Sequence, residues 1–259
     1  VSSTDWSWSV LSFDADHNGL KDLYITNGIN KDIRNNDFAL DFQKKLDEGE
    51  SISLFEMVEQ TPETKLSNYC FKNNGDLEFE EVADSWNLAQ ESFSFGAAYG
   101  DLDNDGDLDL IVNNNNDSPF LMENQVAEGA WLKIKASSGE KNKFGYGVKA
   151  IVFDNGDLQY QELSPVRGYQ SSCAPEIHFG LAGEVEVDSL LVIFPDGRSI
   201  LKNKVKTNQT LMFDIAKAKQ APLNVYDFPK HDFVDYQSAA GVNWVHEENQ
   251  YNDFEREVL

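Results

Sequence analysis

The chain has 259 residues, 41% of them hydrophobic and 12% aromatic, which allows one large or two modest domains with a buried core. It carries 21 basic and 45 acidic residues, a formal charge of −24. This balance disfavours nucleic acid and anionic membrane surfaces as partners, because both are recognised by basic patches, and it agrees with cation binding.

The first predicted elements enclose an acidic loop. Residues 1–28 read as two strands joined by Asp14-Ala-Asp-His-Asn-Gly-Leu-Lys-Asp22. Oxygen-bearing side chains stand at positions 1, 3, 5 and 9 of this loop, and a glycine at position 6 lets the chain turn back toward one ion. The predicted ligands are the side chains of Asp14, Asp16, Asn18 and Asp22 and the backbone carbonyl of Leu20.

Residues 36–60 differ from the segments on either side. Their apolar residues follow the helical period, which predicts a helical insertion with Asn36 or Asp37 as its cap and Ser51 as the cap of a second short helix. Residues 67–82 then alternate as strands around an Asn-Asn-Gly turn, which is typical of a β-hairpin.

A second acidic loop, Asp101-Leu-Asp-Asn-Asp-Gly-Asp-Leu-Asp109, repeats the first at an offset of 87 residues (101 minus 14). Its predicted ligands are the side chains of Asp101, Asp103, Asp105 and Asp109 and the backbone carbonyl of Asp107. Carboxylates this crowded repel one another, and an all-oxygen ligand set suits a hard cation, so we expect two Ca²⁺ sites.

These loops differ from EF-hands. An EF-hand needs a bidentate Glu at position 12 and flanking helices, whereas position 12 here is Ile25 in one loop and Val112 in the other. Both loops run directly into segments rich in β-branched and aromatic residues. The sequence therefore predicts calcium loops inside a β framework.

From residue 127 to residue 216 the pattern changes to dense alternation without acidic loops, which predicts a β-sandwich or barrel-like module. The expected strands begin at Trp131, Val148, Leu158, Val185 and Thr210. Residues 217–259 read as the start of a further repeat, because the sequence from Phe233 echoes the one from Phe79. Residues 1–126 form the first predicted domain.

Two groups of motifs carry a family resemblance. The sequence from Ser94 through the second loop resembles an FG-GAP (VCBS-type) repeat of integrin-like β-propellers, and the first loop resembles another copy with Val10-Leu11 in place of the leading Phe-Gly. Residues 131–215 resemble the ASPIC/UnbV module. The matching pieces are Phe144-Gly-Tyr-Gly-Val, Gly168-Tyr-Gln-Ser, Ile177-His-Phe-Gly-Leu and Phe194-Pro-Asp-Gly, with Phe194 where that family usually has Trp.

The combination resembles large FG-GAP surface proteins of Bacteroidetes-type bacteria and, more distantly, the cartilage acidic protein family. The resemblance implies a mainly β fold of partial propeller blades with an ASPIC/UnbV module. It also implies a parent protein that is extracellular or at the cell surface, outer membrane-associated or periplasmic. We find no window of about 18 apolar residues, so no transmembrane segment is expected in this fragment.

The expected function is a non-enzymatic binding, adhesion or scaffold module, with glycan or protein as its ligand. The alternative is part of a polysaccharide-acting hydrolase or lyase whose site is completed by missing blades. Histidines offer little support for that alternative: His178 reads as a packed strand residue, His17 as an exposed loop residue, and only His246 suits a site completed from elsewhere. Whether Cys70 and Cys173 pair is left open.

Overall fold

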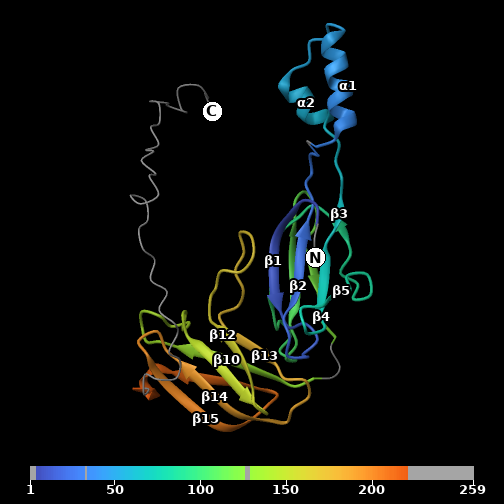
Figure 1. The fold of residues 1–259 in the computed structure, drawn as a ribbon. Coiled ribbons are helices and arrows are strands. Elements are labelled where there is room, and N and C mark those ends of the chain that lie inside the picture. Colours follow the sequence, from blue (N-terminus) through green and yellow to red (C-terminus); the bar gives the residue numbers. More distant parts are fainter. Residues whose placement is uncertain (1–3, 33, 126–128, 221–259) are drawn as a thin grey trace, which may run out of the picture. The chain divides into compact units, whose positions relative to one another are not determined.

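The protein is built mainly of β-strands in the computed structural model, which describes residues 4–32, 34–125 and 129–220. These residues belong to one compact unit, Val1–Ala221. The strands form several separate sheets, and no sheet closes into a barrel in the described part of the chain (Figure 1). The predicted fold class is confirmed: partial propeller blades, a short helical insertion and a sandwich-like module. The described residues include no helix that is long and apolar enough to cross a membrane.

Two antiparallel sheets make up the first half of the described chain. One has the order β1-β2-β4-β5, and the other has the order β7-β8-β9. Their strands are β1 (Ser7–Phe13), β2 (Asp22–Asn27), β4 (Tyr69–Asn73), β5 (Phe79–Glu81), β7 (Ser94–Gly100), β8 (Asp109–Asn114) and β9 (Phe120–Met122). In each sheet an acidic loop joins the first strand to the second, so both loops hold the same position in their sheets.

The pairing within these sheets repeats at the same offset of 87 residues. Each first strand begins with an irregular stretch and then pairs regularly up to its loop. The equivalent closing pairs are Phe13–Asp22 and Gly100–Asp109, and the register shifts lie between Ser7 and Val10 and between Ser94 and Ala97. The two sheets are therefore structural repeats, as expected of neighbouring blades.

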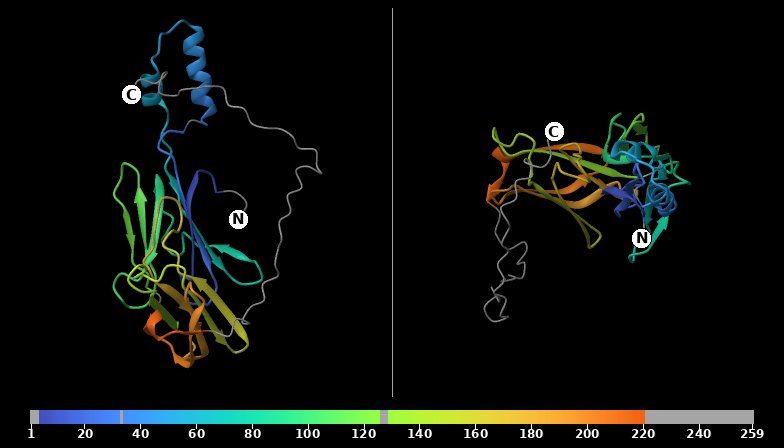
Figure 2. Two further views of the ribbon diagram at one scale, coloured as in Figure 1. Left: turned by 90° about the vertical axis from the view of Figure 1, so that its left-hand side faces the viewer. Right: turned by 90° about the horizontal axis from the view of Figure 1, so that it is seen from above.

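Two helices, α1 (Asn36–Asp47) and α2 (Leu54–Gln60), interrupt the first repeat. The predicted insertion is present, but both predicted caps are wrong. Asn35 caps α1 by accepting a hydrogen bond from the Phe38 N–H, and Ser53 caps α2 in a capping box with Glu56. Neither helix buries a residue, and Figure 2 shows both lying beyond the ends of the strands. The short strands β3 (Leu66–Ser67) and β6 (Glu91–Ser92) pair after the insertion.

The module contains two sheets, ordered β13-β10-β16 and β12-β11-β14-β15-β17. The strands are β10 (Trp131–Ser137), β11 (Lys149–Asp154), β12 (Asp157–Glu162), β13 (Ile177–Gly180), β14 (Glu186–Ile193), β15 (Arg198–Lys206), β16 (Gln209–Asp214) and β17 (Lys219–Gln220), with a 3-10 turn at Ile215–Lys217. Strand β10 runs antiparallel to β13 and parallel to β16. Both sheets contribute to one apolar cluster, which includes Leu132, Ile134, Val152, Phe179 and Leu190.

The sequence anticipated most of these strands but missed the two-residue β17 and the much longer β15. That strand is largely exposed and rich in lysine, so it lacks the apolar alternation of a half-buried strand. Strand β17 still pairs with β15 beyond the predicted module boundary at residue 216. The rest of the predicted further repeat, residues 221–259, lies outside the described residues.

Two acidic loops and a neighbouring cavity as the candidate functional site

The two acidic loops fold alike at the level of hydrogen bonds. The position 9 carboxylate accepts a bond from the backbone N–H at position 2, at 2.9 Å for Asp22 and Ala15 and 2.8 Å for Asp109 and Leu102. Positions 3 and 5 accept bonds from the N–H groups at positions 5 and 7. These pairs are Asp16 with Asn18, Asp103 with Asp105, Asn18 with Leu20, and Asp105 with Asp107. The predicted equivalence of the loops thus extends to their backbone conformation.

Each loop brings three carboxylates together. One oxygen from each of Asp14, Asp16 and Asp22 lies within 4.8 Å of the others. The second loop gathers Asp101, Asp103 and Asp105 in the same way, again within 4.8 Å. Such clusters of oxygen atoms on a turning backbone are the donor set that Ca²⁺ prefers.

The position 1 carboxylates give the clearest reason to expect a cation. Asp14 is 1% exposed, and the Asp101 side chain is 0% exposed. The Oδ1 atom of each is buried and has no hydrogen-bond partner among the described residues. Burying a carboxylate oxygen without a partner costs free energy. The residues of each loop therefore fit a cation that takes the Oδ1 atom of that loop as a ligand.

The position 9 carboxylates have a second role. Besides the bond within the loop, Asp22 accepts a hydrogen bond from the Asn73 N–H at 2.8 Å, and Asp109 accepts one from the Asn124 N–H at 2.9 Å. Each residue thus ties its loop to the end of the third strand of the same sheet, since Asn73 is the last residue of β4 and Asn124 follows β9. These two residues hold the loop together through both oxygens, and each oxygen keeps a lone pair for an ion.

Burial sets the electrostatics of the first loop. It raises the pKa of Asp14 to about 7, although the Gly19 N–H and the charge of Lys21 act in the opposite direction. Burial also raises the pKa of Asp22, against the hydrogen bonds from Asn73 and Ala15. Near neutral pH the loop therefore favours a positive charge beside Asp14, either a bound proton or a cation.

The ASPIC-like module covers both loops. The His178 Nε2 on β13 lies 2.7 Å from the Gly106 carbonyl of the second loop, and the Ala182 N–H donates to the His17 carbonyl of the first loop at 2.8 Å. The first loop lies so close to β13 that a Cβ on Gly180 would be 2.0 Å from Asp14 Oδ2 and 2.7 Å from the His17 Cα. The environment of the candidate sites therefore comes partly from the module.

This cover corrects one prediction. His17 was expected to be exposed, but it is only 3% exposed and stacks on His178 with ring centroids 5.3 Å apart. The prediction was wrong because its burial depends on a module more than a hundred residues away in the sequence. His178 is buried in β13, as expected of a packed strand histidine. Cys70 and Cys173 are both free. His246 lies outside the described residues.

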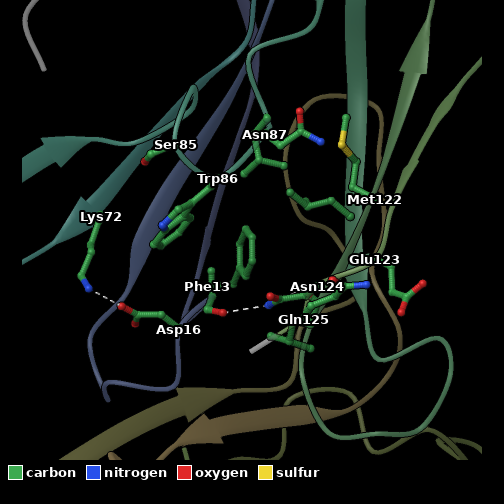
Figure 3. Close-up of a pocket in the computed structure, with 14 residues that line it drawn as sticks. Phe13, Asp16, Lys72, Ser85, Trp86, Asn87, Met122, Glu123, Asn124 and Gln125 are labelled. Carbon is green, nitrogen blue, oxygen red and sulfur yellow. Dashed lines mark hydrogen bonds and ion pairs between the residues drawn. The ribbon is translucent and has the colours of Figure 1, made fainter. Parts of the chain in front are cut away.

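A cavity of about 560 Å³ adjoins the first loop, and its walls come from both repeat sheets. Figure 3 shows Trp86, Phe13 and Met122 around it, with Asn124 and Asp16 near its floor. Asp16 is also a predicted calcium ligand, and its carboxylate pairs with Lys72 at 2.7 Å. The sequence prediction missed this cavity because its walls come from segments that are far apart along the chain.

Comparisons with known proteins match two parts of the chain. The family described as ASPIC and UnbV matches residues 138–220, and the FG-GAP-like repeat family matches residues 61–112. The chain is also similar to cartilage acidic protein 1 of Homo sapiens, with 26% identity over 156 residues that cover 58% of this chain. The match spans 23% of the length of that relative. The protein thus contains an FG-GAP-like repeat, of a kind typical of extracellular proteins, and an ASPIC and UnbV domain.

Proposed function

We propose that this chain is a calcium-stabilised, non-enzymatic binding module of an extracellular or cell-surface protein, outer membrane-associated or periplasmic. The observation that carries the proposal is the pair of buried Oδ1 atoms of Asp14 and Asp101, which have no hydrogen-bond partner within the described ranges and lie in two loops of matching conformation. Asp16, Asn18 and Asp22 would complete the first site. Asp103, Asp105 and Asp109 would complete the second, with the carbonyls of Leu20 and Asp107 as further ligands.

In this proposal the ion is structural. It offsets the mutual repulsion of the carboxylates and ties two neighbouring strands of each repeat together. A ligand that binds only the folded state stabilises it by about 2.7 kcal/mol when its free concentration is a hundred times Kd. Extracellular calcium modules often have Kd values of about 10⁻⁴–10⁻³ M, so the ion would be bound outside cells.

We place the ligand of the module in the cavity beside the first loop and propose that it is a glycan. A cavity of about 560 Å³ is large enough for a few sugar rings. Trp86 offers an aromatic face for sugar stacking, while Asn124, Glu123 and Asp16 offer amide and carboxylate groups for hydroxyls. A protein ligand remains an outcome of the test.

The calcium proposal is tested by titration calorimetry and thermal melts with millimolar calcium or EDTA. We expect two binding sites in the wild type, one in Asp14→Asn, one in Asp101→Asn and none in the double variant. Asp84→Asn serves as the control, because Asp84 is exposed and belongs to neither loop. Unchanged melting in EDTA, together with no heat of binding, would refute the proposal.

The ligand proposal is tested on an array of glycan polymers with the calcium-loaded protein. We expect binding that Trp86→Ala weakens at least tenfold, measured well below the melting temperature of the variant because Trp86 also packs against the core of the repeat sheets. If this substitution does not change glycan binding, the glycan does not bind in this cavity. Hydrolysis or cleavage of a polymer in the same experiment would replace the binding module with the hydrolase or lyase alternative.

A further inference from the structure

One face of the module sheet β13-β10-β16 is directed at the second acidic loop. Side chains alternate along β10, so Leu132 and Ile134 enter the apolar core while Trp131, Lys133 and Lys135 lie on the opposite face. His178 stands opposite Lys133 in the register of β13 and shares that face. This face is thus aromatic and cationic where it meets a loop with five carboxylates.

Lys133 is buried within this contact. Its side chain is 3% exposed, and its ammonium bonds to Asp101 Oδ2, whose side chain is 0% exposed. Glu176 approaches the same ammonium at 3.9 Å, and the Trp131 ring centroid lies 5.5 Å away. A lysine this deeply buried is rare without a paired charge, and Asp101 provides that charge.

In the first loop the position 1 carboxylate has a different hydrogen-bond donor. There the Gly19 N–H donates to Asp14 Oδ2 at 2.9 Å, so a neutral backbone group holds the oxygen that Lys133 holds in the second loop. The second loop also carries more negative charge, because Asp105 and Asp107 stand where the first has Asn18 and Leu20. A cation from the module thus meets the more acidic of the two loops.

We propose that Lys133 is the built-in counter-cation of the second loop. In the metal-free protein it neutralises Asp101 and holds the loop against the module. When a divalent ion binds to Asp101, the ion and the Lys133 ammonium lie on the same carboxylate and repel each other. Lys133 therefore lowers the affinity of the loop for that ion. The first half of this inference concerns only the described contact, and the second half rests on the proposed calcium function.

The metal-free half is tested by thermal melts in EDTA. We expect Lys133→Met to lower the melting temperature by roughly 10 °C, because it leaves a buried carboxylate without a partner. The double variant with Asp101→Asn should recover most of that loss, since both charges are then gone. Lys135→Met is the matched control. It lies on the same strand and face, but its side chain is 43% exposed and it pairs with Glu176 rather than Asp101.

Each outcome decides this half. A loss in Lys133→Met that the double variant does not recover, or that Lys135→Met equals, would overturn it, because packing rather than charge would then explain the effect. Should Lys133→Met fail to fold in EDTA, folding of the double variant supports the inference and its failure overturns it.

The calcium half is tested by titration calorimetry in an Asp14→Asn background, which leaves the second loop as the remaining site. We expect Lys133→Met to bind Ca²⁺ at least tenfold more tightly, because it removes a buried positive charge whose repulsion of a dication is stronger than the same repulsion would be in water. Weaker or equal binding would overturn this half and assign Lys133 to orienting the ligand instead. If the wild type binds no Ca²⁺ at either loop, the proposed function fails and this half fails with it, while the EDTA melts still decide the metal-free half.

Discussion

His178 is expected to make the protein sensitive to acid through its position between the two loops. Its Nε2 lies 2.7 Å from the Gly106 carbonyl, which a neutral ring satisfies as a donor. Its Nδ1 is buried and has no hydrogen-bond partner among the described residues. Protonation would add an N–H at Nδ1, where no described acceptor lies, on a residue that is only 4% exposed. The neutral form is therefore favoured in the folded state.

The size of the effect follows from the pKa. Burial lowers the pKa of His178 from 6.5 to about 3, against the Gly106 hydrogen bond. Below pH 6.5 the unfolded chain takes up a proton that the folded chain does not, so stability falls as the pH falls toward 3. The free energy of unfolding falls by about 1.4 kcal/mol for each pH unit below 6.5, which amounts to about 2 kcal/mol at pH 5. For a chain of this size that lowers the melting temperature by about 6 °C.

The measurement compares the wild type with His178→Gln in EDTA, at pH 7.5 and pH 5. Glutamine retains an N–H donor for the Gly106 carbonyl but does not titrate. We expect the wild type to lose about 6 °C more than the variant between the two pH values, since all other titrating groups are shared. Equal losses would refute the reasoning and show that the ring titrates near its ordinary pKa in the folded state.

Three further substitutions test packing: two lie on either side of the same contact, and Gly139→Ala is an open-space control for the first of them. Gly106→Ala should destabilise by about 3 kcal/mol or more in thermal melts, because its φ is +108° and its Cβ would lie 2.0 Å from the Trp131 ring. Gly139→Ala, with φ of +95° and no atom within 4 Å of its Cβ, should lose only the backbone part of about 1–2 kcal/mol. Phe179→Ala should cost about 3–5 kcal/mol in urea unfolding, because the side chain is 0% exposed in the module core, and a loss below 1 kcal/mol would contradict that assignment.

The sequence predicted the position and the equivalence of the two loops because the residues that set them are local, while the calcium ligands stay a prediction. Ligand types, glycine positions and flanking strands all lie within a few residues of each other, and the recurring hydrogen bonds follow from that spacing. The contacts of Lys133 with Asp101 and of His178 with Gly106 could not be predicted in this way. They join residues 32 and 72 positions apart, and no local pattern marks them. The exposure predicted for His17 failed for the same reason.

The position 9 aspartates show how a ligand prediction and a structural role can be separated. Both oxygens of Asp109 accept backbone N–H groups, from Leu102 and Asn124, and the residue is 2% exposed. Asp109→Asn replaces one acceptor with an NH₂ group, so one of these buried N–H donors loses its partner. We expect a loss of about 1–3 kcal/mol in EDTA as well as in calcium.

Asp103 provides the contrast, because it is exposed and belongs to the carboxylate cluster of the same loop. Asp103→Asn removes one charge from mutually repelling groups, so stability in EDTA should stay the same or rise slightly, while the gain on adding calcium should shrink. In thermal melts Asp109→Asn should thus fall below the wild type in both buffers, whereas Asp103→Asn should fall below it only in calcium. Loss of stability in EDTA for Asp103→Asn but not for Asp109→Asn would reverse the assignment, making position 3 the tether and position 9 purely a ligand.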